Sequence, residues 1–292
     1  MLVELVRTTT KDGLRLDGAL SVPLDNQPPV VAVDAFVFLH GVGGAFYGGA
    51  LFQTLQTSFL NLGSAVVRVN TRGHGSVSMI ATVGGAGRYG AAFEVVDQCR
   101  HDVRAWVDWL VERGYDRIGL LGHSLGAIKS VYAEALESHP HVTCVLAASP
   151  PRLSYAAFQN GPRSADHFSS ITAAREHVAA GRPDQLFTAK FPFPMLLCAA
   201  TYLDKYGPDE RYNFLLHVDK LNVPTLFTYG QSELDSGGVA FAGLPDAIES
   251  VVTDATSVQV VTIPGADHFY TGKHDELATV MADWARAELP PG

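Results

Sequence analysis

The chain has 292 residues, of which 47% are hydrophobic, and its 30 acidic residues outnumber 21 basic ones to give a net charge of -9. A chain of this length and composition can bury the core of one large α/β domain with an elaboration, or of two small domains. Lys and Arg form no cluster, which argues against nucleic acid and against an anionic membrane surface as partners.

The N-terminal segment is typical of a strand rather than of a targeting sequence. Residues 1–7 alternate apolar and polar side chains and lack the basic start and continuous apolar core of a secretory signal. Residues 14–22 follow the turn signal Lys11-Asp12-Gly13, so the two segments are expected to pair antiparallel at a sheet edge. No stretch reaches the length of a membrane span free of charge. We therefore expect a cytoplasmic protein with no membrane partner.

Further apolar runs rich in β-branched residues alternate with helical patterns along the chain. The runs are residues 35–39, 65–69, 117–121, 142–147, 225–229 and 258–263. Between them lie helices such as residues 95–111, where apolar side chains recur at helical spacing. This alternation predicts an α/β fold, with a mostly parallel sheet covered by helices on both faces. The Gly- and Ala-rich residues 81–92 are expected to form a loop.

The alternation is interrupted between Pro151 and about Leu221, where helical patterns follow one another without a clear strand. We interpret residues 151–218 as a helical cap over the sheet, and residues 1–150 together with 219–292 as the core domain. The alternative is a simple extension of the core. Eight aromatic residues are dispersed here: Tyr155, Phe158, Phe168, Phe187, Phe191, Phe193, Tyr202 and Tyr206. Because aromatic side chains in helices more often pack in a core, only a minority should contact substrate.

A G-x-S-x-G pentapeptide, Gly122-His123-Ser124-Leu125-Gly126, follows the apolar residues 118–121 and precedes an amphipathic helix at 127–136. Strand, tight turn and helix form the setting in which such a serine is exposed as a nucleophile. The turn imposes strained backbone on Ser124, and the flanking glycines remove Cβ atoms that would collide where strand and helix approach. The alternative is a glycine-bounded turn with a capping serine. We predict that Ser124 is the nucleophile.

A nucleophilic serine needs a base that accepts its proton and a carboxylate that orients the base. In this architecture the acid follows a later strand, and the histidine follows the last one. His268 stands in a short loop after residues 258–263 and is the predicted base. Glu233 and Asp235 both follow residues 225–229. Spacing favours Glu233 as the acid, with Asp235 as the alternative.

Attack on an acyl group also requires two backbone N–H donors for the oxyanion. Leu125, directly after the nucleophile at a helix N-terminus, is expected to supply one. The second is expected from His40-Gly41-Val42-Gly43-Gly44, where glycines let the backbone approach a substrate, and Val42 is the natural choice. His40, His74 and His123 are candidates for lining the site, but none follows the order required of the base.

The cysteines and the remaining histidines do not predict a metal site. Cys99, Cys144 and Cys198 are odd in number and widely spaced, so we interpret them as small core residues rather than a disulfide framework. His139-Pro140-His141 lacks a third ligand and is interpreted as a surface loop. We expect no metal and no cofactor.

Taken together, these motifs resemble those of the α/β-hydrolase superfamily over nearly the whole chain. The resemblance is carried by His40-Gly41, by Arg72-Gly73-His74-Gly75, by the pentapeptide around Ser124 and by Gly265-Ala266-Asp267-His268. It implies an eight-stranded sheet, a Ser-His-acid triad and a helical cap inserted after the sixth strand. Glu233 departs from the pattern, because most members carry aspartate at that place.

We predict a cofactor-independent carboxylic ester hydrolase that acts on a small or medium apolar substrate through an acyl-enzyme. The same triad would also serve a thioesterase, an amidase or an acyltransferase, and a ligand-binding protein that kept the fold is a further alternative. A serine nucleophile argues against dehalogenation, which uses aspartate. Phe46, Tyr47 and the cap aromatics favour an apolar acyl or alcohol group. The sequence does not indicate an oligomeric state.

Overall fold

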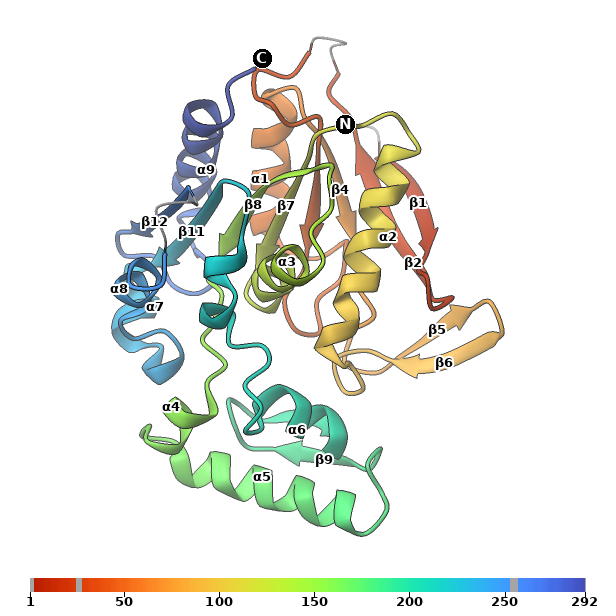
Figure 1. The fold of residues 1–292 in the computed structure, drawn as a ribbon, viewed down its shortest axis with the longest axis vertical. Helices are drawn as coiled ribbons and strands as arrows, with labels where there is room; N and C mark the ends of the chain where they lie inside the picture. The colour runs from red at the N-terminus through yellow and green to blue at the C-terminus, as the bar shows by residue number, and fades with distance from the viewer. Residues whose placement is uncertain (1–2, 25–27, 253–256, 292) are drawn as a thin grey trace.

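A computed structural model describes residues 3–24, 28–252 and 257–291, and a central eight-stranded sheet organises them (Figure 1). The strand order is β1-β2-β4-β3-β7-β8-β11-β12. The strands are β1 (Val3–Thr9), β2 (Arg15–Ser21), β3 (Ala35–Leu39), β4 (Ala65–Val69), β7 (Ile118–His123), β8 (Val142–Ala148), β11 (Thr225–Gly230) and β12 (Val258–Ile263). β2 pairs antiparallel with both neighbours, and the pairs from β4 to β12 are parallel. The predicted fold class is therefore confirmed.

Helices cover both faces of the sheet, and each face has its own hydrophobic core. On one face α1 (Ala50–Asn61) packs beside α9 (His274–Glu288), and on the other lie α2 (Cys99–Val111) and α3 (Leu125–Leu136) (Figure 1). β3 illustrates why a central strand has a continuously apolar sequence. Phe36 and Phe38 point into the α1/α9 core, whereas Val37 points into the α2/α3 core. A strand buried on both faces needs apolar side chains at every position.

The predicted loop at residues 81–92 is wrong. β5 (Ser78–Thr82) and β6 (Gly85–Tyr89) form an antiparallel hairpin that projects beside β2 (Figure 1). A bridge between Leu14 and Thr82 ties it to the N-terminal hairpin. Glycine and alanine have low β-propensity, so the composition gave no strand signal. The predicted helix at 95–111 begins as the 3-10 turn η1 (Val96–Gln98) and continues as α2.

The segment between β8 and β11 contains strands as well as helices, which corrects its description as purely helical. In order it comprises α4 (Tyr155–Gln159), α5 (Ser164–Ala179), β9 (Leu186–Ala189), β10 (Met195–Cys198), α6 (Ala199–Tyr206), η2 (Phe214–Leu216) and η3 (Val218–Lys220). β9 and β10 pair antiparallel, and four-residue strands are too short to show clear alternation in sequence. The division into a core and this insertion (residues 151–218) stays a prediction.

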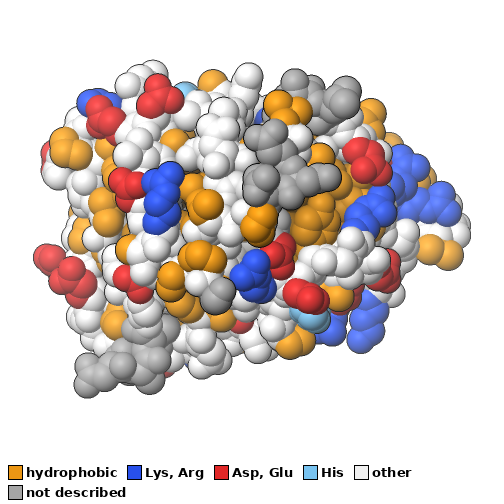
Figure 2. Space-filling model, turned by 90° about the horizontal axis from the view of Figure 1, so that it is seen from above, with side chains coloured by type: hydrophobic (Ala, Val, Ile, Leu, Met, Phe, Trp, Pro, Cys, Tyr) orange, Lys and Arg blue, Asp and Glu red, His pale blue; other side chains and the backbone are white. Residues whose placement is uncertain are grey.

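The last third of the chain completes the sheet and its covering helices. After β11 come α7 (Gln231–Ser236), η4 (Gly238–Ala240) and α8 (Leu244–Glu249). The three cysteines are unpaired and buried, as predicted for core residues. Among the described helices, none is long and apolar enough to cross a membrane. Figure 2 views the molecule from above, and on this face acidic and basic side chains are interspersed among apolar and neutral ones.

Candidate active site

Ser124 occupies the sharp turn between β7 and α3. Its φ of 57° and ψ of -122° lie outside the regions that non-glycine residues favour, and such strain concentrates at functional sites. A Cβ on Gly122 would lie 2.1 Å from the carbonyl oxygen of Gly126, and one on Gly126 would lie 2.0 Å from that of Leu39. Only glycine therefore allows the strand and the helix to approach this closely.

Three side chains far apart in the sequence form one chain of hydrogen bonds. His268 Nε2 lies 3.0 Å from Ser124 Oγ, and His268 Nδ1 is hydrogen-bonded to Glu233 Oε1. A carboxylate only accepts, so Nδ1 carries the proton and Nε2 is free to accept from the serine hydroxyl. Asp235 lies elsewhere, because its Oδ1 accepts an exposed hydrogen bond from Gln231 at 2.8 Å. Of the two candidate acids, the structure brings Glu233 to His268.

Further polar groups, which the sequence analysis missed, hold the second oxygen of Glu233. The Glu233 side chain is buried, and its Oε2 accepts from Ser149 Oγ at 2.7 Å and from the Gly230 N–H at 3.2 Å. Ser149 Oγ also lies 2.9 Å from Tyr270 OH, which in turn donates to the Thr228 carbonyl at 3.0 Å. Ser149 and Tyr270 both have positive φ, at 51° and 54°. The carboxylate is thus held from both sides.

A cavity of about 960 Å³ opens over Ser124 and His268. Among the described residues that line it there is no Asp, Glu, Lys or Arg. One part of the wall comes from residues 40–52, which lead from β3 into α1, and another part comes from the insertion. A cavity of this size with this lining suits an apolar ligand with a few polar contacts.

Only some of the aromatic side chains in the insertion face this cavity. Phe158, Phe193 and Tyr206 line it, whereas the other five members of the set do not. Phe191 and Tyr202, for example, are buried in the core that the insertion forms with α3. The expectation that only a minority of them contacts substrate stays a prediction. Phe46 and Tyr47 are absent from the described lining, and Tyr47 is 77% exposed.

Val42 and Leu125 both line the cavity beside Ser124. Within the described residues, no acceptor is hydrogen-bonded to either backbone N–H. A Cβ placed on Gly41 would lie 3.3 Å from Ser124 Cβ, so the residue before Val42 lies directly against Ser124. Two unbonded N–H groups near a serine hydroxyl are suited to stabilising a developing oxyanion.

Residues 36–280 match the model of the alpha/beta hydrolase family, which is most of the chain. This chain belongs to the alpha/beta hydrolase family. The resemblance predicted from the motifs is thereby confirmed. No curated protein sequence matches the chain significantly.

Solved structures of other alpha/beta hydrolases and of esterases share the fold at low identity. Est1E from Butyrivibrio proteoclasticus with bound ferulic acid superposes with a TM-score of 0.67 at 18% identity, covering 97% of this chain and 99% of that one. The esterase domain of a Rhodothermus marinus protein gives 0.60 at 18% identity, covering 98% and 99%. The alpha/beta hydrolase GrgF from Penicillium sp. sh18 gives 0.70 at 14% identity, covering 99% of both chains. At such identities the likeness shows the fold.

Two buried histidines of this alpha/beta hydrolase lie in neutral form beside the hydrogen-bonded Ser124, His268 and Glu233. His123 Nε2 donates to the His268 carbonyl oxygen at 2.7 Å, and burial together with nearby His268 lowers the pKa of His123 to about 4. Burial and the charge of Lys129 lower the pKa of His40 to about 3. Both rings line the cavity, whereas His74 is not among its described lining residues.

Mild acid is expected to destabilise the fold because of these two rings. In the unfolded state both histidines are protonated below their ordinary pKa of 6.5. In the native state His40 and His123 are protonated only below about pH 3 and about pH 4. Each ring therefore removes about 1.4 kcal/mol of unfolding free energy per pH unit as the pH falls through this window. Urea unfolding measured between pH 6.5 and 4.5 checks the slope.

Glu134 contributes to the pH dependence of stability in the opposite direction and provides a control. Burial raises its pKa from 4.5 to about 7, so the native state binds a proton before the unfolded state does, and stability rises as the pH falls from 7 to 4.5. Glu134→Gln removes this opposing contribution and should roughly double the net acid slope. A slope that is flat in both proteins would contradict neutral, buried rings.

Proposed function

We propose that the protein is a serine carboxylic ester hydrolase that acts on small or medium, uncharged apolar esters. The observation that carries this proposal is the hydrogen-bonded chain from Glu233 through His268 to Ser124, which ends in a cavity whose described lining residues include no Asp, Glu, Lys or Arg. Val42 and Leu125 are assigned as the oxyanion donors. The expected partner is a small-molecule ester, and a cytoplasmic location stays a prediction.

In the acylation half-reaction, Ser124 Oγ attacks the ester carbonyl carbon while His268 Nε2 accepts the serine proton. The carbonyl electron pair moves onto oxygen, and the Val42 and Leu125 N–H groups stabilise the oxyanion. Glu233 stabilises the imidazolium that forms. When the tetrahedral intermediate collapses, the bond to the alcohol oxygen breaks, and His268 returns the proton to the departing alcohol.

Deacylation follows the same path with water as the nucleophile. His268 removes a proton from water, whose oxygen attacks the acyl carbon and regenerates the oxyanion. Collapse breaks the bond to Ser124 Oγ, and His268 reprotonates the serine as the carboxylic acid leaves. Acylation and deacylation transfer only an acyl group and protons, so neither step needs a redox cofactor.

A panel of p-nitrophenyl esters tests the substrate class. Uncharged acyl chains from acetyl to dodecanoyl should be hydrolysed, with a preference for medium chains that fill the cavity. The hemisuccinate should be hydrolysed about 100-fold more slowly than an uncharged acyl group of equal length, because the described lining residues include no Lys or Arg to pair with its buried carboxylate. Equal rates on the charged and uncharged esters would contradict this assignment.

Matched ester, thioester and amide substrates separate the other acyl-transfer chemistries, and we expect the ester to give the largest kcat/KM. A fluorophosphonate probe tests the non-catalytic alternative. The probe should label the peptide that contains Ser124, because only a serine activated by a base reacts with it. An unlabelled protein that binds esters without hydrolysing them would instead support a ligand-binding role.

A further inference from the structure

A cluster of buried charges lies outside the triad, beside the loop that carries Val42. Glu94, in the segment between β6 and η1, forms ion pairs with Lys129 of α3 and Lys205 of α6, at 2.5 and 3.4 Å. The three side chains are at most 1% exposed. Burial opposes ionisation of Glu94, but the two lysines outweigh it and lower the Glu94 pKa to about 2. Charges buried this completely are uncommon in proteins.

A continuous series of hydrogen bonds connects this cluster to residues 40–44, the loop that carries Val42. Lys129 Nζ donates to Thr71 Oγ1 at 2.9 Å. The Thr71 backbone N–H donates to His40 Nε2 at 3.1 Å, so that ring nitrogen is unprotonated. Neutral His40 therefore carries its proton on Nδ1 and donates it to the Gly41 carbonyl at 2.7 Å.

The last bond in this series sets the direction of the Val42 N–H. The Gly41 carbonyl and the Val42 N–H belong to one planar trans peptide unit, in which the N–H points opposite to the C=O. The Gly44 N–H also donates to the Gly41 carbonyl, at 3.1 Å. With two donors on the carbonyl, the peptide plane cannot rotate without losing both bonds. This peptide lies close to Ser124, because a Cβ added to Gly41 would lie only 3.3 Å from Ser124 Cβ.

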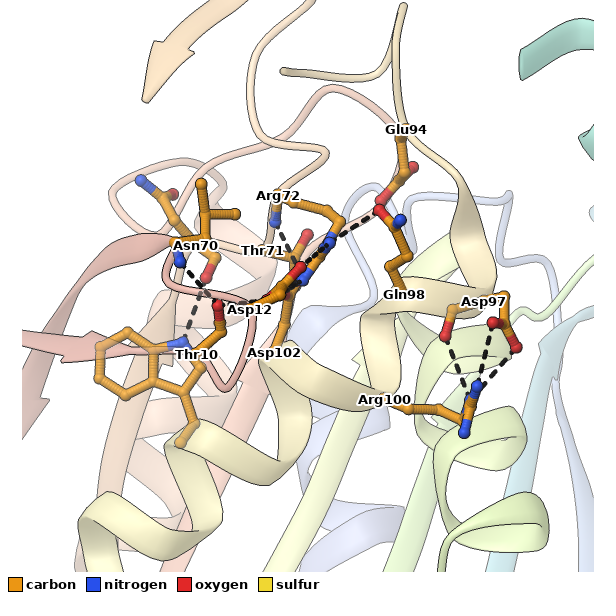
Figure 3. Close-up of polar contacts among 12 residues, drawn as sticks. Thr10, Asp12, Asn70, Thr71, Arg72, Glu94, Asp97, Gln98, Arg100 and Asp102 are labelled. Carbon is orange, nitrogen blue, oxygen red and sulfur yellow. Dashed lines mark hydrogen bonds and ion pairs between the residues drawn. The ribbon is translucent and has the colours of Figure 1, made fainter. Parts of the chain in front are cut away.

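Arg72, which follows Thr71 in the chain, is anchored by its own side chain. The buried Arg72 guanidinium bonds Asp102 at 2.7 Å, Gln98 at 2.7 Å and Asp12 at 2.9 Å, and Figure 3 shows these partners converging on it next to Thr71. The following Gly73 leaves room for the ion cluster, since a Cβ there would lie 2.1 Å from Glu94 Oε1. The Arg72-Gly73 pair thus holds Thr71 and admits the Glu94 carboxylate.

We propose that the buried Glu94–Lys129 ion pair is a positioning device for the oxyanion site. Glu94 holds Lys129, which holds Thr71 and His40, and these orient the Gly41–Val42 peptide so that the Val42 N–H meets the oxyanion. Lys129 and Thr71 are positioning residues. Lys205 is a second counter-ion of Glu94, and within the described residues it has no hydrogen bond to Thr71, His40 or Gly41. The inference rests on the proposed ester hydrolysis.

The comparison of Lys129→Met with Lys205→Met tests the proposal. Each variant removes one buried lysine that contacts Glu94, and each leaves Glu94 paired with the other lysine, so the two changes to the cluster are matched. Lys129→Met should lower kcat about tenfold or more with KM changed by less than about twofold, because the donor is misdirected in the transition state. Lys205→Met should leave kcat within about twofold. Equal losses of kcat would overturn the proposal.

Thr71 offers a second test that does not alter the buried charges. Thr71→Val removes the hydroxyl that accepts from Lys129 and should lower kcat as Lys129→Met does, whereas Thr71→Ser keeps the hydroxyl and should restore activity. Combining Thr71→Val with Lys129→Met should lower kcat little more than either change alone, because both remove the same hydrogen bond between Lys129 and Thr71. Additive losses in the double variant would overturn it.

Inhibitor binding separates this role from a general loss of structure. A trifluoromethyl ketone forms a tetrahedral adduct with Ser124 that carries the oxyanion, so its affinity should fall in parallel with kcat/KM in Lys129→Met and Thr71→Val. The matching methyl ketone should keep its affinity. An equal loss for both ketones would overturn the inference while leaving the proposed function intact. A wild-type protein that hydrolyses no ester would overturn the proposed function and the inference with it.

Discussion

Replacement of Ser124 by alanine is expected to lower kcat for p-nitrophenyl butyrate by about 10⁴-fold or more. The variant has no oxygen to form the acyl-enzyme, and His268 has no nucleophile to activate. The cavity and the Val42 and Leu125 N–H groups remain, so the substrate should still bind. Steady-state hydrolysis and the size of the p-nitrophenol burst measure the effect.

The fold should survive this substitution, which makes the loss attributable to chemistry. Alanine differs from serine only by the hydroxyl, whose hydrogen bond to His268 is partly exposed. Circular dichroism and thermal unfolding should therefore match those of the wild type, or show a slightly higher Tm. Ser250→Ala, which removes an exposed hydroxyl remote from the cavity, is the matched control and should keep full activity. Substantial hydrolysis by the Ser124 variant would refute the mechanism.

Glu233→Gln is expected to lower kcat by about 10⁴-fold at nearly unchanged geometry. The Gly230 N–H already points at one oxygen of the carboxylate, so the amide NH₂ of glutamine is repelled from that side and turns toward His268. Nδ1 must then accept a hydrogen bond, which places the ring proton on Nε2. A protonated Nε2 cannot accept the proton of Ser124.

Asp235→Asn is the matched control for the acid, because it makes the same chemical change two residues away. Asp235 is hydrogen-bonded to Gln231 on the surface, and the control should keep kcat within about twofold. Glu233→Asp should lie between the two, since the shorter side chain retains the charge but loses reach. A larger loss in Asp235→Asn than in Glu233→Gln would transfer the role of acid to Asp235.

The strands of the main sheet were predictable because most are buried on both faces. Residues 35–39, 65–69 and 258–263 coincide with β3, β4 and β12, and the other predicted runs differ from the observed strands by one or two residues. The hairpin β5–β6 and the pair β9–β10 were not predicted. They are short and mostly not buried, so neither continuous hydrophobicity nor clean alternation marked them.

The parts of the candidate site that directly follow a strand were predictable from the order of residues along the chain. Ser124 and His268 follow strands whose carboxyl ends share one sheet edge, so their proximity was inferred from order alone. The choice between Glu233 and Asp235 depends on the turn of α7, which spacing does not resolve. Ser149 reaches Glu233 from the end of β8, and Lys129 reaches Thr71 from within a helix. Such contacts between separate elements leave no local motif.

The described wall of the cavity combines residues of the insertion with residues from loops of the sheet, and under the proposed function this arrangement separates selectivity from reactivity. The groups proposed to carry out the reaction stand on the sheet and its loops, while Phe158, Phe193 and Tyr206 reach the cavity from residues 151–218. Mutations in that segment can therefore reshape the acyl or alcohol compartment without disturbing proton transfer. Under the proposed function, substitutions in this segment are expected to change which esters are preferred while hydrolysis itself persists.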